Sequence, residues 1–222
     1  MFPFYFITDP IFEEGFPLKA VTQAIAGGAR LIQYRDKVNT RSVMYENAKR
    51  LREITAQAGA TLIINDQIDL ALAVGADGVH LGQNDLPISA ARKISGKKAR
   101  GGRPLIVGIS THTFDEAISA EIEGADYIGF GPIFKTKTKA DLRLPTGISP
   151  IVQIKQKVKI PLVAIGGITQ KDLLAIFDAG ANGVAAISAV ADDIESNVRE
   201  WMKTIAEFGN ILSVGMKEPR VP

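Results

Sequence analysis

The chain of 222 residues predicts an α/β fold, a single (β/α)8 TIM barrel that spans residues 1–222. The first observation is helical spacing of apolar residues in segments such as Val43–Ala56, Phe114–Glu123 and Leu173–Phe177. Between such segments lie short apolar runs rich in β-branched or aromatic residues: Phe4–Thr8, Leu31–Arg35, Thr61–Asn65, Gly78–Leu81, Leu105–Ile109, Tyr127–Phe130, Leu162–Ile165 and Gly183–Ser188. Near-continuous apolar strands that alternate with helices are typical of a parallel sheet covered by helices.

A recurring Gly-Ala pair is the third observation. It ends predicted helices just before a strand, at Gly28, Gly59, Gly75, Gly124 and Gly180, where a left-handed C-cap residue would turn the chain back into the sheet. Eight strand–helix units leave about 28 residues for each, which is compact but sufficient for a barrel. The rival is an open doubly wound sheet, which would carry a glycine fingerprint after its first strand, where this sequence has Thr8–Ile11.

Composition excludes several classes of protein. With 46% hydrophobic residues the chain can bury a core, and with no cysteine it has no disulfide scaffold, thiolate metal site or thiol nucleophile. It has no apolar run of about 20 residues, and its first residues lack the basic stretch of a signal peptide, so we expect a cytoplasmic protein without a membrane partner. A basic run with no aromatic residues among it predicts a solvated connection, not a nucleic-acid site: Arg92, Lys93, Lys97, Lys98, Arg100 and Arg103.

The polar residues that follow the predicted strands are the candidate site, because active sites of (β/α)8 barrels form at the carboxyl ends of the strands. After the second strand, Gln33, Arg35 and Lys37 alternate and share one face, with Tyr34 and Asp36 on the other. No acid shares the first face. Arginine and lysine there predict a clamp for an anion, and the alternative is a solvated cluster at the rim.

Two aspartates end neighbouring strands. Asp66, after Asn65, and Asp85 can converge on one point, and paired carboxylates that face a cationic clamp favour Mg²⁺. For either residue alone, N-capping of the following helix is an equal alternative.

Glycines and a serine follow the last two strands. Gly166, Gly167, Ile187 and Ser188 predict loops whose backbone N–H groups cradle a phosphate, the alternative being tight turns that need glycine. An anion site here and another at the clamp would imply two phosphorylated substrates, or one bisphosphate.

A long irregular segment follows the sixth strand. Its Thr136, Thr138 and Lys139 suit oxyanion binding, and we expect Phe134–Gly147 to become ordered over a loaded site, the alternative being a solvated loop. Two histidines lie near the predicted site. The place of His80 within a predicted strand indicates a hydrogen-bonded core residue, whereas His112, beyond the fifth strand, could carry protons or begin a helix. The sequence has neither a Ser-His-Asp spacing nor a lysine within a predicted strand, so these features do not indicate covalent catalysis.

Taken together, these motifs resemble the thiamine-phosphate synthase family over essentially the whole chain. The resemblance rests on the sequences Gln33–Lys37, Asn65-Asp66, Gly78–Asp85, Ser110–Thr113, Gly131–Lys139 and Ala164–Ile168. It implies a (β/α)8 barrel and a transferase that joins 4-amino-2-methyl-5-pyrimidinylmethyl diphosphate to 4-methyl-5-(2-phosphoethyl)thiazole, forming thiamine phosphate and releasing diphosphate. The basic Lys97–Arg103 stretch is the departure from the family pattern, on the face away from the site.

Residue roles follow from the resemblance, position by position. Mg²⁺ would be held by Asp66 and Asp85, and the catalytic residues would be Arg35, Lys37, Ser110 and Lys139. The pyrimidine diphosphate would contact Gln33, Tyr34, Arg35, Asp36, Lys37, Asn65, Ser110 and Lys139. The thiazole phosphate would contact Thr136, Lys137, Thr138, Gly167, Ile187 and Ser188.

Two alternative functions remain open at this point. A sister group of the same barrel resembles a thiazole tautomerase with a histidine placed like His112, but it needs neither clamp nor metal pair. A regulatory barrel that only binds thiazole phosphate is the other. The sequence leaves open whether the chain forms a homo-oligomer and whether the thiazole carries a carboxylate.

Overall fold

Eight parallel strands close into a barrel in this computed structural model, which describes residues 3–9, 17–96, 104–136 and 144–215, with side chains up to residue 209. Each strand pairs with the next in the chain, and the last pairs with the first. The predicted fold is therefore confirmed. The strands are β1 (Phe4–Ile7), β2 (Leu31–Tyr34), β3 (Thr61–Asn65), β4 (Gly78–Leu81), β5 (Ile106–Thr111), β6 (Tyr127–Phe130), β7 (Leu162–Ile165) and β8 (Gly183–Ala186).

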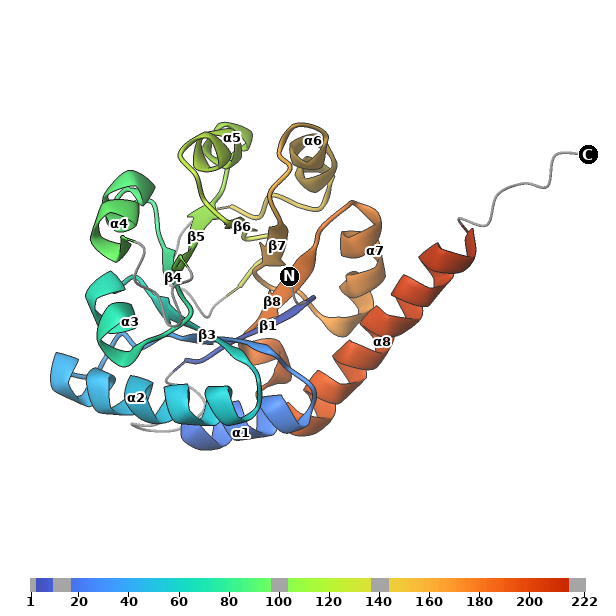
Figure 1. Cartoon of the computed structure of the whole chain (residues 1–222). Helices are drawn as coiled ribbons and strands as arrows, with labels where there is room; N and C mark the ends of the chain where they lie inside the picture. Colours follow the sequence, from blue (N-terminus) through green and yellow to red (C-terminus); the bar gives the residue numbers. More distant parts are fainter. Residues whose placement is uncertain (1–2, 10–16, 97–103, 137–143, 216–222) are drawn as a thin grey trace, which may run out of the picture.

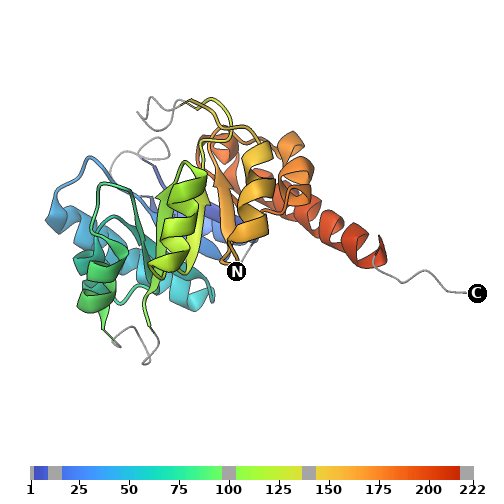
Figure 2. The ribbon, with the colours of Figure 1, turned by 90° about the horizontal axis from the view of Figure 1, so that it is seen from above.

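Helices surround the barrel in a ring (Figure 1). Two 3-10 helices, η2 (Gln170–Asp172) and η3 (Ser188–Val190), follow β7 and β8. The α-helices are α1 (Leu18–Ala26), α2 (Arg41–Gln57), α3 (Ile68–Val74), α4 (Ile88–Ser95), α5 (Phe114–Ile122), α6 (Ser149–Lys157), α7 (Leu173–Asp178) and α8 (Ile194–Gly215). The last of them extends beyond the barrel (Figures 1 and 2). Among the described residues, none of these helices has the length and apolar character needed to span a membrane.

The core has two layers because strand side chains alternate. On β1, Phe4 and Phe6 point outward to the helices, where the Phe4 ring packs edge-on against Trp201 at 5.6 Å. The inner layer fills the barrel: Tyr5, Ile7, Leu31, Ile63, Tyr127, Val163, Ala185 and Ile187. On β2 the same alternation sends Tyr34 outward and Gln33 inward.

Four strands end one or two residues away from their predicted limits, and β1 and β2 each stop one residue earlier, at Ile7 and Tyr34. β8 stops at Ala186 because Ser188 begins η3, and β5 continues to Thr111, which pairs with Phe130 of β6. The predicted Gly-Ala turns are confirmed, since all five of their glycines have positive φ: Gly28, Gly59, Gly75, Gly124 and Gly180.

The described part of the basic run, Arg92 and Lys93, lies in the last turn of α4. Arg92 of α4 donates to the carbonyl oxygens of Leu105 at 2.6 Å and Gly124 at 2.8 Å, and to the carboxylate of Asp126. These contacts lie just before β5 and β6, on the face away from the carboxyl ends of the strands, so Arg92 joins the end of α4 to the starts of these two strands. Residues 97–103 lie outside the described part of the chain.

Candidate active site

A cavity of about 530 Å³ opens at the carboxyl ends of the strands. Loops after β2 to β8 line it, as the predicted fold requires. It brings together most of the predicted site residues that the structure describes: Arg35, Lys37, Asn65, Asp66, Asp85, Ser110, Thr136, Gly167, Ile187 and Ser188.

Three predicted substrate contacts do not line this cavity. Gln33 is buried inside the barrel, where its amide donates to the Tyr5 hydroxyl at 2.8 Å. Tyr34 and Asp36 face outward to α2, with the Tyr34 hydroxyl donating to Asp36 at 2.8 Å. Strand alternation turns the side chains of Tyr34 and Asp36 away from the cavity, on the side opposite to the predicted substrate contacts. Lys137, Thr138 and Lys139 lie outside the described residues, as does most of the segment expected to close over the site.

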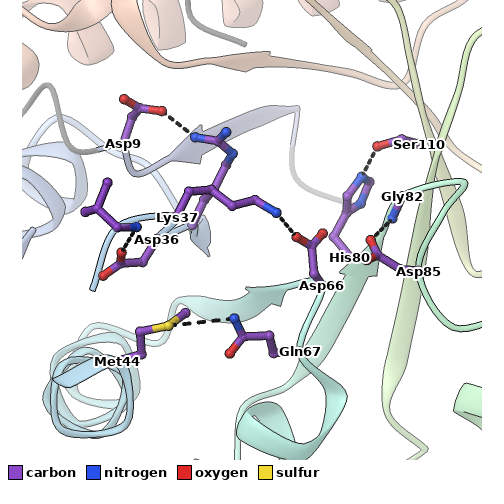
Figure 3. Close-up of polar contacts among 12 residues, drawn as sticks. Asp9, Asp36, Lys37, Met44, Asp66, Gln67, His80, Gly82, Asp85 and Ser110 are labelled. Atoms are coloured by element: carbon purple, nitrogen blue, oxygen red, sulfur yellow. Dashed lines mark hydrogen bonds and ion pairs between the residues drawn. The ribbon is translucent and has the colours of Figure 1, made fainter. Parts of the chain in front are cut away.

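Both cations of the clamp are paired with carboxylates. Arg35 contacts the Asp9 carboxylate at 2.5 Å, and the Lys37 ammonium forms an ion pair with Asp66 (Figure 3). The sequence showed no acid on the same face of β2, but the strands that pair with β2 supply acids, Asp9 after β1 and Asp66 after β3. Asp9 follows β1 and is the functional candidate that sequence reasoning missed.

Backbone contacts fix the clamp at the mouth. The Thr8 hydroxyl accepts the Arg35 N–H at 2.9 Å and donates to the Arg35 carbonyl oxygen at 3.1 Å. These bonds continue the pairing of β1 and β2 by one residue after the strands end. The Arg35 side chain is 13% exposed and that of Asp9 8%, so water screens this pair little.

Asp66 and Asp85 do converge, as expected from their places at the ends of β3 and β4 (Figure 3). Burial raises the pKa of Asp85, and the neighbouring Asp66 carboxyl raises it further; a bond from the Gly82 N–H and the Lys37 charge oppose the shift. Neither aspartate caps a helix: α3 begins after Gln67 and α4 after Pro87. Within the described ranges no group of three or more His, Cys, Asp or Glu side chains could hold a metal ion.

A second wall of the cavity is formed by the loops after β7 and β8. Gly166 has φ +102° and Gly167 has φ +64°, conformations that L side chains rarely adopt. A Cβ at Gly167 would lie 2.5 Å from the Lys135 carbonyl oxygen, so this position needs glycine to let the two loops approach. Ser188 begins η3 at the same wall. Such loops after the seventh and eighth strands are where phosphate sites of this fold form.

Comparison with known proteins agrees with this geometry. The family model described as thiamine monophosphate synthase matches residues 4–190. The chain belongs to the thiamine-phosphate synthase family. It is 45% identical to the thiamine-phosphate synthase of Chloroflexus aurantiacus over 88% of this chain and 89% of that protein. It is 46% identical to that of Halalkalibacterium halodurans over 93% and 96% of the two chains.

A solved structure of the same family has the same architecture. The thiamine phosphate pyrophosphorylase from Pyrococcus furiosus superposes with a TM-score of 0.83 at 38% identity, covering 93% of this chain and 96% of that one. The sequence resemblance is thereby confirmed, and with it the reaction: a transferase that forms thiamine phosphate from the pyrimidine diphosphate and the thiazole phosphate.

The two histidines of the site region have different partners. His112 lines the cavity; its Nδ1 contacts the Gly131 carbonyl oxygen at 2.5 Å, so Nδ1 carries the proton and donates. The helix after β5 is capped by Thr113, whose side chain accepts the Glu116 N–H at 3.1 Å. His80 is a buried, hydrogen-bonded residue, as predicted, and the structure shows that its partners are Tyr127 and Ser110.

Asp36 stabilises the turn after β2 through hydrogen bonds to the residues that follow Lys37. Its carboxylate accepts the N–H groups of Val38 and Asn39, each at 3.0 Å, and the Asn39 side-chain amide at 2.8 Å. Burial raises the pKa of Asp36, but these bonds and that from Tyr34 outweigh it and hold the pKa below its usual range. A carboxylate with a depressed folded pKa stabilises the protein above its unfolded pKa of about 3.9 and stops doing so as pH falls through the lower folded value.

Asp36→Ala is therefore expected to lower the free energy of unfolding at pH 7 by about 1–3 kcal/mol, the range for buried hydrogen-bonding groups left unsatisfied. Urea denaturation of both proteins at pH 7 and at decreasing pH below about 4 measures this. The difference should shrink towards low pH. A difference that stays constant down to the lowest pH would contradict the assigned role.

Proposed function

We propose that the two walls of the cavity hold the two substrates: the pyrimidine diphosphate at Arg35, Lys37, Asp66 and Asp85, and the thiazole phosphate at the backbone of Gly167, Ile187 and Ser188. The observation that carries this proposal is a single cavity with cations and paired carboxylates on one wall and exposed glycine-rich backbone on another. One wall suits a diphosphate with its metal, and the other a phosphate monoester.

The donor set at Asp66 and Asp85 fits Mg²⁺. The metal prefers oxygen ligands, takes one or two carboxylates, and completes its coordination with waters and substrate phosphates. Burial raises the pKa of Asp85 and the adjacent Asp66 carboxyl raises it further, so a cation at this pair would relieve the repulsion between the two carboxylates. When bound, the cation neutralises charge on the diphosphate and between these two carboxylates.

Lys37 changes partner in this proposal. Its ammonium is paired with Asp66 in the substrate-free chain. Asp66 would hold the cation together with Asp85, and the Lys37 ammonium would then donate to a diphosphate oxygen. Arg35 keeps Asp9 on one nitrogen, and the remaining N–H groups of its planar guanidinium can donate to the same diphosphate.

The chemical step follows from charge stabilisation. The bond between the pyrimidine methylene carbon and the diphosphate oxygen breaks, its electron pair leaves with diphosphate, and the aminopyrimidine ring stabilises the cation that remains. Arg35 and Lys37 stabilise the departing charge, and such preorganised electrostatics is often the largest catalytic contribution. The thiazole nitrogen, held across the cavity, then supplies the electron pair of the new carbon–nitrogen bond. An electron-withdrawing group on the pyrimidine should therefore slow the reaction steeply.

The test is turnover of both substrates at controlled metal concentration. With Mg²⁺ or Mn²⁺, thiamine phosphate and diphosphate should appear in equal amounts. In excess chelator turnover should stop, because the Asp66 and Asp85 carboxylates then face the diphosphate without a cation between them. Full turnover in excess chelator would contradict the metal assignment.

A further inference from the structure

A chain of hydrogen bonds crosses the interior of the barrel beneath the cavity. The Gln33 amide nitrogen donates to the Tyr5 hydroxyl at 2.8 Å, and that hydroxyl lies 2.9 Å from the Tyr127 hydroxyl. The Tyr127 hydroxyl lies 2.9 Å from Nδ1 of His80, and Nε2 of His80 lies 2.9 Å from the Ser110 hydroxyl. We refer to these five residues as the interior chain. It joins β1, β2, β4, β5 and β6.

The barrel is shaped around this chain. A Cβ at Gly108 would lie 2.1 Å from Cζ of Tyr127, so glycine there makes room for the phenol ring. The Tyr5 and Tyr127 rings meet edge-on at 6.0 Å, and the His80 ring lies 5.4 Å from that of Tyr127. Leu, Ile and Val fill such interiors in barrels at no cost in buried polar groups, so a row of polar groups calls for another explanation.

The hydrogens of the interior chain can all run in one direction. Each phenol has a single hydrogen, and burial raises the pKa of both Tyr5 and Tyr127, so both remain protonated. With the Gln33 amide donating to Tyr5, the Tyr5 hydrogen goes to Tyr127 and the Tyr127 hydrogen to Nδ1 of His80. His80 then carries its proton on Nε2 and donates to Ser110. The Ser110 hydrogen is left to point into the cavity that Ser110 lines.

Reversing the Gln33 amide would reverse every bond. Tyr5 would then donate to the amide oxygen, His80 would carry its proton on Nδ1, and the Ser110 hydrogen would be taken up by Nε2. Ser110 would present only lone pairs to the cavity. The orientation of the amide at one end therefore decides whether the hydroxyl at the other end is a donor.

We propose that Tyr5, Tyr127 and His80 are positioning residues that hold Ser110 as a hydrogen-bond donor to the pyrimidine diphosphate. This rests on the assignment of Ser110 to that substrate. A donor aimed at an anionic leaving group stabilises the charge that develops there, whereas a lone pair would repel it. The same direction of hydrogens excludes Ser110 as a nucleophile activated by His80, because Nε2 is then protonated and cannot accept the serine proton.

Tyr127→Phe is the central test, because it removes one hydroxyl and keeps the ring against Gly108. We expect kcat to fall about tenfold or more, in the range known for residues that orient a group in direct contact. The KM for the thiazole phosphate should not change. Thr55→Val is the matched control: Thr55 is fully buried in α2, its hydroxyl bonds to the Arg52 carbonyl oxygen, and its loss should leave kcat unchanged.

A double-mutant cycle with Ser110→Ala separates positioning from a purely structural role. If Tyr127 acts through Ser110, Tyr127→Phe should change kcat by less than about twofold in the Ser110→Ala background. If the two substitutions instead lower kcat by independent factors that multiply in the double variant, the proposal is overturned. Wild-type kcat in Tyr127→Phe, with a defect in Ser110→Ala, would overturn only this inference. Wild-type kcat in Ser110→Ala would overturn the substrate assignment of Ser110 as well.

A second pair of variants keeps the test valid if Tyr127→Phe does not fold. Glutamine at position 80 can accept at one end of its amide and donate at the other, whereas leucine can do neither. His80→Gln should therefore retain more of the wild-type kcat than His80→Leu. If both variants lost kcat equally, the proposal that His80 orients the Ser110 hydroxyl would be contradicted.

Discussion

Asp85→Ala is expected to lower kcat by about 10²–10³-fold, the effect of removing one preorganised electrostatic group, while the protein stays folded. Asp85 lines the cavity, where its carboxylate accepts the Gly82 N–H at 2.7 Å and lies against the carboxyl of Asp66. Its loss leaves the cation with one protein carboxylate. Thermal unfolding and kcat as a function of Mg²⁺ concentration measure the two effects separately.

Asp69→Ala is the control for this variant. Asp69 is an exposed aspartate on α3 that pairs with Arg41 and does not line the cavity, so its loss should leave kcat and the Mg²⁺ dependence unchanged. If Asp85→Ala kept full turnover, or saturated at the same Mg²⁺ concentration as the parent protein, the carboxylate pair would not be the metal site.

The second large effect concerns which substrate each wall binds. Arg35→Ala and Lys37→Ala are expected to weaken an inert pyrimidine diphosphate analogue by about 10- to 100-fold, which corresponds to the loss of a charge-assisted hydrogen bond. The affinity for thiazole phosphate should barely change. Gly167→Ala should do the reverse, because a methyl group at φ +64° and 2.5 Å from the Lys135 carbonyl oxygen displaces the backbone of the wall formed by the loops after β7 and β8. Ser188→Ala should act in the same direction as Gly167→Ala.

Calorimetric titration of each ligand into each variant separates these cases. Arg41→Ala, which removes an exposed cation outside the cavity, is the control and should change neither affinity. Equal losses for both ligands in every variant would show that the two anion sites are not distinct.

The fold was predictable from the sequence because it depends on local patterns. Short apolar runs and the glycines that end helices identify the strands and their order, and the first strand, which no glycine fingerprint follows, favours the closed barrel over an open doubly wound sheet. The alternation along β2 likewise predicted that Tyr34 would lie opposite Gln33. It did not show that the face of Tyr34 and Asp36 is the helix layer, where neither can reach the cavity.

The site residues that follow strand ends could be predicted from the sequence. The site residues whose roles depend on contacts between different strands of the barrel could not. Asp66 and Asp85 stood out because polar residues break apolar runs. Asp9 did not, because its partner Arg35 is 26 positions away and meets it only when β1 and β2 pair. Tyr5 and Tyr127 are 122 positions apart and read as ordinary core aromatics within strands, so their hydrogen bond could not be inferred from pattern alone.

The most direct test of this account is the affinity of the chain for inorganic diphosphate with and without Mg²⁺, measured by calorimetry. If Asp66 and Asp85 bind the cation between them and the diphosphate, Mg²⁺ must strengthen diphosphate binding, and diphosphate must strengthen Mg²⁺ binding by the same factor. The affinity for thiazole phosphate should not depend on Mg²⁺. Diphosphate binding of equal strength in Mg²⁺ and in chelator would contradict the account.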